Sequence, residues 1–400
     1  MDPLRKGQRW ILDAFIAQGG MDILHPEAAA SFEQFGYDAT DFKTVFSRVK
    51  STSQVPQAWA SVGKEIEARA DFWHARGCDQ AALGLYERAA LLYGRTHYSF
   101  FGNDPRRHRY LDKLVATFQK VAALATYPVR RVVLPFEGKN LHGVFEHGVG
   151  ATQQPCVICL PGMDMFKEDW HAVMRQRIVP RGWAAFSLDG PGQGESLTRG
   201  LKMTMDNYER ALSALIDWLV QQPEVDAERI VLIGSSMGSW WGMRAAAAEP
   251  RLRAVSGNMA HVGDRMVDTA QPSYLANLAY MTGITDYEAV RQFSAQMTLH
   301  DIAPKVRTPY LMVFGESDEL TSVESTLAIY RLLGGPKELL MYEREFHPLG
   351  PVCAEWLDAS LDWLGQAMAG RFEAGYSRQL YISKQGQYID GAGEPPWWTP

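Results

Sequence analysis

The sequence is poor in cysteine and lacks the patterns that cysteine and histidine form around metals. Four cysteines in 400 residues do not make a disulfide framework, so a reducing, cytoplasmic location is expected. Cys156 and Cys159 have the spacing of half a zinc or redox motif, but in a strand they would point to opposite faces and pack in the core. The chain has no His-Glu-x-x-His motif and no second cysteine pair. We therefore expect no metal and no other cofactor.

Long apolar runs and clusters of one charge are also missing. No stretch approaches the roughly 18 apolar residues of a membrane span. Asp13 interrupts the apolar run within residues 1–20, which predicts an amphipathic helix rather than a secretory signal. The net charge is −6, from 40 basic and 46 acidic side chains, without the basic cluster that tracks a nucleic-acid backbone. A small-molecule substrate is the expected partner, with no nucleic acid and no membrane.

The length and the periodicity of the chain predict two parts. Apolar residues make up 46% of the chain, which is ordinary for a globular protein, but single cores stop growing at about 250–300 residues. Residues 32–124 repeat apolar side chains at helical spacing, as in Val62, Ile66 and Ala70. We therefore predict an all-helical N-terminal cap domain, a catalytic domain with a cap insertion, and a C-terminal extension. Their predicted bounds are 1–127, 128–370 with the insertion at about 261–300, and 371–400.

Beyond residue 127 the pattern predicts an α/β fold. A β-hairpin is expected first, and strands then alternate with helices, which is typical of a mostly parallel sheet with helices on both faces. The hairpin strands are 130–136 and 141–147, and the later strands 156–160, 183–188, 229–234, 253–259, 310–314 and 338–342. The helices are 168–179, 205–220, 236–248, 322–333 and 352–369. Residues 274–299 are surplus helical sequence and a plausible cap, and a further hairpin is expected around 385–386.

The sequence Gly234-Ser235-Ser236-Met237-Gly238 lies between a predicted buried strand and a helix. In a turn this tight, side chains at both glycine positions would clash with the strand and the helix. The turn lifts the Ser236 hydroxyl above the sheet edge, at the positive end of the helix. The alternative, a turn without chemistry, is disfavoured by this strand-to-helix context. Ser236 is the predicted nucleophile.

A serine nucleophile needs a base to remove its proton and an acid to orient that base. In this arrangement the chain order is serine, acid, histidine, each after a later strand. Asp318 follows the strand 310–314, and His347 lies after the strand 338–342 as the only histidine beyond Asp318. They are the predicted acid and base, with Glu316 and Glu319 as alternatives for the acid.

The negative oxygen of the intermediate needs two N–H donors. We predict the backbone N–H of Met237 and that of Met163, although Pro161-Gly162 before it leaves the register open by one residue. The glycine-rich residues 189–195 complete neither a phosphate loop nor a dinucleotide fingerprint. They are interpreted as a structural turn that braces the floor of the site.

Several motifs together resemble those of the α/β-hydrolases. Within that superfamily the chain is similar to the group of 2,6-dihydroxypseudooxynicotine hydrolases and fungal heptaketide (yellowish-green type) hydrolases, and more distantly to fermentation-respiration-switch-type esterases. The resemblance covers nearly the whole chain, including the helical N-terminal domain. The motifs are Pro161-Gly162-Met163-Asp164 with Lys167-Glu168, the run Asp189-Gly-Pro-Gly-Gln-Gly-Glu195, Gly234-x-Ser236-x-Gly238, Asp318 and His347.

The resemblance implies the α/β-hydrolase fold and a Ser-His-Asp enzyme that cleaves esters or carbon–carbon bonds beside a ketone. It also implies a site between the two domains and a homodimer. A carbanion leaving group must be delocalised and protonated, and Asp264 or Asp268 is a possible auxiliary acid. Relatives favour glutamate there, and a capping or surface carboxylate is the alternative.

Methionine and tryptophan near these motifs suggest an apolar or aromatic substrate, although such residues are more often plain core. Two other functions stay open. The same acyl-enzyme would serve an acyltransferase or cyclase, because access of water depends on how the cap closes. A non-catalytic binding protein could also use this scaffold, but an intact serine, acid and histidine argue against it.

Overall fold

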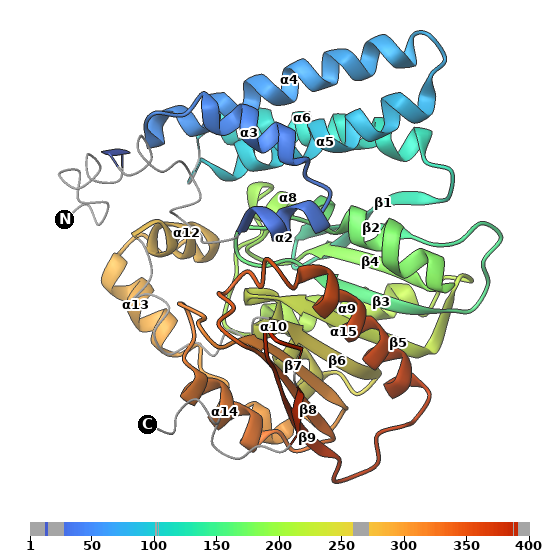
Figure 1. The fold of residues 1–400 in the computed structure, drawn as a ribbon, viewed down its shortest axis with the longest axis vertical. Helices are drawn as coiled ribbons and strands as arrows, with labels where there is room; N and C mark the ends of the chain where they lie inside the picture. The colour runs from blue at the N-terminus through green and yellow to red at the C-terminus, as the bar shows by residue number, and fades with distance from the viewer. Residues whose placement is uncertain are drawn as a thin grey trace.

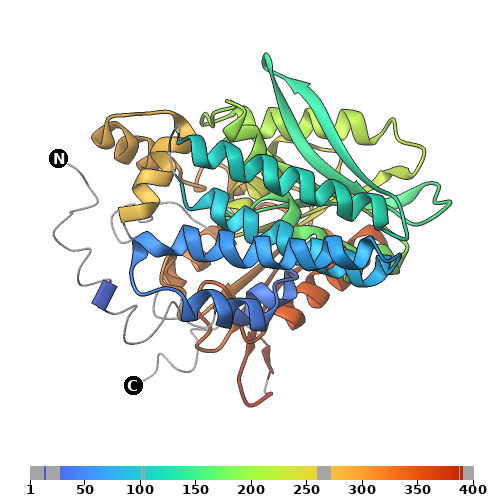
Figure 2. The ribbon, with the colours of Figure 1, turned by 90° about the horizontal axis from the view of Figure 1, so that it is seen from above.

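The computed structural model describes residues 13–14, 28–100, 102, 104–258, 272–386 and 388–390. Its first part is helical, as predicted, and forms a layer at one end of the molecule (Figure 1). Figure 2 shows the long helices of this layer running beside one another. The helices are α2 (Ala28–Gln34), α3 (Ala39–Ser47), η3 (Thr52–Gln54), α4 (Val55–His74), α5 (Asp79–Tyr98) and α6 (Pro105–Leu124).

Local signals explain where these helices begin and turn. The Asp104 side chain accepts a hydrogen bond from the Arg106 N–H, and Pro105 occupies the first turn of α6, where a missing N–H costs nothing. Between α4 and α5 the chain reverses through Gly77, whose φ is 74°, a conformation that glycine adopts without strain. The α4–α5 pair is therefore a helical hairpin.

The second part is a ten-stranded sheet among the described residues, in the order β1-β2-β4-β3-β5-β6-β7-β8-β9-β10. Strands β3 to β9 pair in parallel, whereas β1, β2 and β10 are antiparallel to their neighbours. The strands are β1 (Val129–Phe136), β2 (Lys139–Glu146), β3 (Gln154–Leu160), β4 (Ala184–Asp189), β5 (Val225–Ser235), β6 (Leu252–Asn258), β7 (Tyr310–Gly315), β8 (Lys337–Tyr342), β9 (Ser377–Ile382) and β10 (Tyr388–Asp390). The predicted mostly parallel α/β sheet is confirmed.

Helices cover both faces of this sheet and bury two separate apolar cores. On one face α9 (Asn207–Leu219), α10 (Met237–Ala248) and α14 (Val323–Leu332) pack on the strands. On the other face lie α15 (Cys353–Met368) and the segment 167–181, and the N-terminal helices join the same apolar core. Cys156 belongs to the first core and Cys159 to the second. The prediction that these two thiols point to opposite faces and pack in the core is therefore confirmed.

Residues 168–179 do not form the single helix that their pattern predicts. The segment begins as a short 3-10 helix whose buried Asp169 carboxylate accepts a hydrogen bond from the Phe166 N–H. Pro180, which has no N–H to donate, lies in its last turn. The pieces are η4 (Lys167–Trp170), α7 (His171–Val173), the π-helical η5 (Met174–Ile178) and η6 (Val179–Arg181). This irregular backbone carries three successive buried charged residues, from Lys167 to Asp169.

Two further regions complete the description. Between β6 and β7 the helices α12 (Pro272–Thr282) and α13 (Tyr287–Ala295) occupy the predicted cap insertion. The hairpin expected near residue 385 is formed by β9 and β10, and β9 also pairs with β8, so the main sheet continues beyond residue 370. The remaining short helices are α8 (Gly194–Thr198) and η7 (Ala303–Lys305). Over the described part of the chain, every helix is too short or too polar to cross a bilayer.

Candidate active site

Ser236 occupies a strained turn between β5 and α10. Its φ of 52° and ψ of −121° fall where non-glycine residues are rare. A Cβ added to Gly234 would lie 2.3 Å from the Gly238 oxygen, and one added to Gly238 would lie 2.3 Å from the Leu160 oxygen. Both positions therefore require glycine, as the motif predicts, and the Ser236 N–H is held by the Asn258 oxygen at 2.9 Å.

The three side chains predicted as nucleophile, base and acid meet at the carboxyl edge of the sheet. His347 Nε2 lies 2.8 Å from Ser236 Oγ, and its Nδ1 lies 2.8 Å from Asp318 Oδ2. The other carboxylate oxygen of Asp318 accepts hydrogen bonds from the N–H groups of Leu320 and Thr321 at 2.8 and 2.9 Å. The imidazole thus bridges a hydroxyl and a fixed carboxylate.

The two alternative acids have other partners. Glu319 Oε2 accepts a hydrogen bond from the backbone N–H of His347 at 3.0 Å. Glu316 Oε2 accepts from the Arg344 N–H at 2.8 Å and from the Tyr381 hydroxyl at 3.2 Å. Of these three carboxylates, Asp318 is the one joined to the imidazole nitrogen, so the geometry favours it as the orienting acid.

The surroundings of His347 favour its protonated form overall. Burial opposes the charged ring, but the Asp318 carboxylate and the bond to it outweigh burial, and the pKa of His347 lies above its ordinary value. The negative charge of Glu319 acts in the same direction. An imidazole held in this way accepts a proton from Ser236 and keeps the resulting charge next to Asp318.

The loop that follows β3 passes directly against the nucleophile. A Cβ added to Gly162 would lie 3.3 Å from the Cβ of Ser236, so glycine permits the close approach. Met163 follows and lines the same pocket as Ser236. Met237 is the first residue of α10, where the N–H groups have no acceptor within the helix. Both predicted oxyanion donors therefore lie next to Ser236, and their role stays a prediction.

Gln193, which was not among the predicted site residues, holds the loop after β3 in place through hydrogen bonds. Its Nε2 donates hydrogen bonds to the Pro161 and Gly162 oxygens at 2.8 and 3.1 Å. Its Oε1 accepts one from the Tyr208 hydroxyl at 2.5 Å. These contacts agree with the interpretation of residues 189–195 as a brace. A glutamine inside a glycine-rich run was the available sequence signal.

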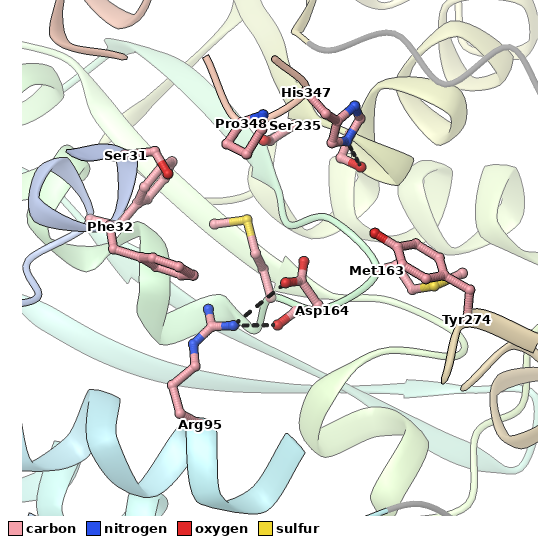
Figure 3. A pocket seen from close by; sticks show the side chains of 12 residues that line it. Ser31, Phe32, Arg95, Met163, Asp164, Ser235, Tyr274, His347 and Pro348 are labelled. Carbon is pink, nitrogen blue, oxygen red and sulfur yellow. Dashed lines mark hydrogen bonds and ion pairs between the residues drawn. The ribbon is translucent and has the colours of Figure 1, made fainter. Parts of the chain in front are cut away.

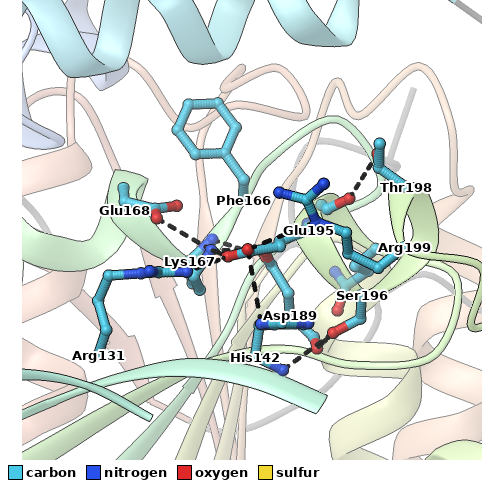
Figure 4. A network of polar contacts seen from close by, with 12 residues as sticks. Arg131, His142, Phe166, Lys167, Glu168, Asp189, Glu195, Ser196, Thr198 and Arg199 are labelled. Carbon is cyan, nitrogen blue, oxygen red and sulfur yellow. Dashed lines mark hydrogen bonds and ion pairs between the residues drawn. The ribbon is translucent and has the colours of Figure 1, made fainter. Parts of the chain in front are cut away.

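The ends of the same run hold a buried cluster of charges (Figure 4). Lys167 Nζ lies 2.9 Å from Glu168 Oε1, 3.2 Å from Asp189 Oδ2 and 2.9 Å from Glu195 Oε2. Asp189 also accepts hydrogen bonds from the backbone N–H groups of Lys167 and Glu195, at 2.8 Å each. Arg131 adds a second cation, 2.7 Å from Glu195 Oε2. The cluster ties the segment after β3 to the segment after β4.

This cluster pairs three carboxylates with three cations, because Arg199 Nε also lies 3.9 Å from Glu195 Oε1. Burial raises the pKa of Glu168 although Lys167 is adjacent, and the neighbouring Asp189 and Glu195 raise it further. Glu195 is different: burial opposes its ionisation, but Lys167, His142 and Arg131 lower its pKa to about 2. Lys167 is the cation that contacts all three carboxylates of the cluster.

A pocket opens in front of Ser236 and His347 (Figure 3). Its empty space, including the mouth, is about 750 Å³. The N-terminal helices, the loop after β3, the nucleophile turn, the cap helix α12 and the histidine loop all contribute to it. The lining residues are Ser31, Phe32, Phe35, Arg95, Met163, Asp164, Met165, Ser235, Ser236, Tyr274, His347 and Pro348. The pocket thus lies between the helical part and the sheet, as the resemblance implies.

Two buried side chains that belong to none of the sequence motifs connect the walls of the pocket. On α12, Asn277 Nδ2 donates to the Tyr98 hydroxyl of α5 at 3.0 Å and lies 3.5 Å from the Met163 oxygen. On α5, Arg95 donates to the Tyr37 hydroxyl at 2.7 Å and to the Asp164 backbone oxygen at 3.0 Å. The helical part and the cap are therefore anchored to the loop that carries the predicted oxyanion donor.

Asp264 and Asp268, the possible auxiliary acids, lie outside the described residues. Within the part of the chain that the structure describes, no group of three His, Cys, Asp or Glu side chains is arranged to hold a metal ion.

Comparison with protein families and curated proteins identifies the relatives of this chain. A family model described as "Esterase FrsA-like" matches residues 57–366. The chain is 28% identical over 274 residues to the 2,6-dihydropseudooxynicotine hydrolase of Paenarthrobacter nicotinovorans, covering 68% of this chain and 73% of that protein. It is 31% identical over 211 residues to the hydrolase LUC6 of a Fusarium species, covering 50% of each. The match thus spans about half the length of that fungal relative.

Solved structures lead to the same group. The crystal structure of the 2,6-dihydroxy-pseudo-oxynicotine hydrolase superposes with a TM-score of 0.77 at 25% identity, covering 87% of this chain and 98% of that one. AbyA5, with a TM-score of 0.63 at 19% identity, shares the fold. The fold, the family match and these named hydrolases agree. The chain therefore belongs to the FrsA-like esterase family and is an enzyme of the α/β-hydrolase type.

Proposed function

We propose that this enzyme is a serine hydrolase in which Ser236, His347 and Asp318 form the catalytic triad. The observation that carries the proposal is the continuous chain of hydrogen bonds from Ser236 Oγ through the imidazole to Asp318, at the edge of the pocket. The strained backbone of Ser236 supports it, because such strain is retained where function requires it.

The geometry supports a two-step mechanism. Ser236 Oγ attacks the substrate carbonyl carbon while His347 Nε2 takes the hydroxyl proton, and the negative oxygen faces the N–H groups of Met237 and Met163. The intermediate then expels the leaving group, which takes the proton from His347. A water molecule attacks the acyl-enzyme with the same base, releases the acid and restores Ser236.

We propose an acyl or ketone substrate with an apolar or aromatic body. Phe32, Phe35 and two methionines line the pocket beside the reacting groups. Cleavage of an ester and of a carbon–carbon bond beside a ketone differ in the leaving group, which is an alkoxide in the first and an enolate in the second. The enolate needs a proton on carbon, which His347 or the proposed auxiliary acids Asp264 and Asp268 would supply.

Activity-based labelling followed by a substrate panel tests the proposal. A fluorophosphonate is expected to modify Ser236 and to abolish turnover. Aryl esters and 1,3-diketones of matched size are then compared, with the products identified by mass spectrometry. Faster cleavage of the diketone would assign carbon–carbon hydrolysis, and faster cleavage of the ester would assign ester hydrolysis. A protein that resists the probe and cleaves neither class would contradict the proposal.

The acidic limb of the pH profile provides a second test. His347 must be neutral to accept the Ser236 proton, so kcat/KM is expected to rise with pH through a pKa above the ordinary value of 6.5. Asp318→Asn removes the charge that raises this pKa, so the limb is expected to move to lower pH while kcat falls by about 10⁴-fold.

Glu319→Gln tests a weaker electrostatic effect on the pKa of His347. The amide oxygen of glutamine can still accept a hydrogen bond from the His347 backbone N–H, but the negative charge is lost. We expect the acidic limb of the pH profile to move to lower pH by less than in Asp318→Asn, and not to move in Glu316→Gln. The measurement is kcat/KM from about pH 5 to pH 9. An unchanged limb in Asp318→Asn would exclude His347 as the titrating base.

A further inference from the structure

The pocket in front of Ser236 is mostly apolar but contains a carboxylate. Among the described lining residues, Asp164 is the acidic one, and half of its side-chain surface, 50%, is exposed. The neighbouring ion-pair residues Arg95 and Asp169 are buried, with 8% and 0% exposed. Of these three charged groups, Asp164 is the one open to a ligand.

Arg95 does not neutralise Asp164 fully, because the guanidinium is shared. Its Nη2 donates to Asp169 Oδ2 at 3.0 Å, whereas its Nη1 donates to the Asp164 backbone oxygen at the same distance. The Asp164 carboxylate lies farther away, with Oδ2 3.6 Å from Nη1. One cation thus faces two carboxylates, and the more distant one is on the pocket side (Figure 3).

Tyr274, Phe32 and Phe35, which line the same pocket, do not offset the negative charge of Asp164. Tyr274 lies on the opposite wall in Figure 3. Burial and the negative charge of Asp164 hold the pKa of this phenol well above its ordinary value, so Tyr274 stays protonated and uncharged. The aromatic rings of Phe32 and Phe35 complete this end of the pocket. A carboxylate among apolar walls favours a hydrogen-bond donor and repels an anion.

Asp164 lines the same pocket as the reacting groups Ser236 and His347. Asp164 follows Met163, the predicted oxyanion donor, and consecutive Cα atoms are about 3.8 Å apart. A ligand group bound by Asp164 would therefore lie in the same pocket as the carbonyl that Ser236 attacks. Such an interaction orients the substrate as well as binding it.

We propose that Asp164 determines substrate specificity by accepting a hydrogen bond from an O–H or N–H group on the acyl portion of the substrate. The preferred class is an acyl compound with an apolar body and a hydroxyl or protonated amine away from the scissile bond. Substrates with a carboxylate at that place are rejected. This inference rests on the proposed serine hydrolase function and adds the substrate class to it.

Matched esters test the proposal. The probes are 4-nitrophenyl esters of 3-phenylpropanoic acid whose ring carries a 4-hydroxyl, 4-aminomethyl, 4-methyl or 4-carboxylate group. For the wild-type enzyme we expect kcat/KM for at least one donor ester to exceed that of the methyl ester about 10-fold, mainly through KM. The carboxylate ester is expected to be the poorest. The hydroxyl and aminomethyl esters distinguish the two kinds of donor.

For the variants Asp164→Asn and Asp164→Leu, the ratio of kcat/KM between two esters is measured within each protein. A general loss of activity cancels in this ratio. Asp164→Asn keeps an acceptor but loses the charge, and the aminomethyl preference and carboxylate penalty are expected to shrink. Asp164→Leu is expected to lose the hydroxyl preference as well. Asp112→Asn, at an exposed ion pair with Arg199, is the control and is expected to keep the wild-type ratios.

Different results would contradict the role of Asp164 and the proposed hydrolase function. Ratios that are equal in the wild type and in both Asp164 variants would overturn the role of Asp164, while labelling of Ser236 would still support the hydrolase. A wild-type preference for the carboxylate ester would overturn it without any variant. Absence of labelling and of turnover for every ester would instead refute the proposed function itself.

Discussion

Ser236→Ala is expected to lower kcat by at least about 10⁴-fold on the best substrate of the panel. Alanine keeps the Cβ, so the strained turn costs the same as with serine, and only the hydroxyl that would form the acyl-enzyme is lost. The remaining turnover would come from binding and from the N–H donors acting on a direct attack by water. The measurement is kcat and KM at one pH, with circular dichroism to verify the fold.

Ser322→Ala is the matched control for this substitution. Ser322 caps α14, where its side chain accepts a hydrogen bond from the Ser325 N–H at 3.1 Å. Its loss is expected to cost about 1 kcal/mol of stability and to leave kcat within about two-fold, because the residue lies outside the site. Retention of more than a tenth of the wild-type kcat in Ser236→Ala would mean that another group is the nucleophile.

Lys167→Met is expected to reduce the free energy of unfolding by about 3–5 kcal/mol, because removal of one partner leaves buried charges uncompensated. Lys167 is fully buried and contacts three carboxylates within 3.2 Å. Methionine has a similar apolar stem, so lost packing contributes little. Urea denaturation at pH 7 measures the change.

Glu168→Gln is the control for charge balance in the same cluster. Burial raises the pKa of Glu168 above its ordinary value of 4.5, so ionising this carboxyl costs folding free energy as the pH rises above that value. The variant is therefore expected to match or exceed the stability of the wild type at pH 8. At pH 5, where the folded wild type holds this proton, the two are expected to unfold alike. Equal destabilisation by both substitutions would show that shape, not charge, stabilises the cluster.

Much of the fold could be predicted because its signals are local. The β1–β2 hairpin, the parallel strands and the helices of the N-terminal part follow from apolar periodicity and turn residues within a few positions of one another. The prediction of a single helix over residues 168–179 was wrong, because apolar periodicity does not show that charged residues of this segment are buried. The pairing of β9 with β8 was also not foreseen, since strand partners depend on the whole sheet. Dimerisation stays a prediction.

For the site, the sequence determined the nucleophile turn, because a side chain at Gly234 would collide with Gly238 four residues on. Glycine at position 238 is required by the tertiary structure, since a side chain there would collide with the Leu160 oxygen of β3. The sequence also supplied the order of Ser236, Asp318 and His347, and the structure brought these three within hydrogen-bond distance.

Only the tertiary structure decided what surrounds them. Arg95 reaches Tyr37 and Asp169 across 58 and 74 residues of chain, and Asn277 reaches Tyr98 across 179. The partial exposure of Asp164 and the hydrogen bonds of Gln193 to the loop after β3 likewise depend on how helices and strands pack. Local motifs fix backbone conformation through steric limits on neighbouring residues, whereas the partner and the exposure of a side chain are set by packing between distant segments.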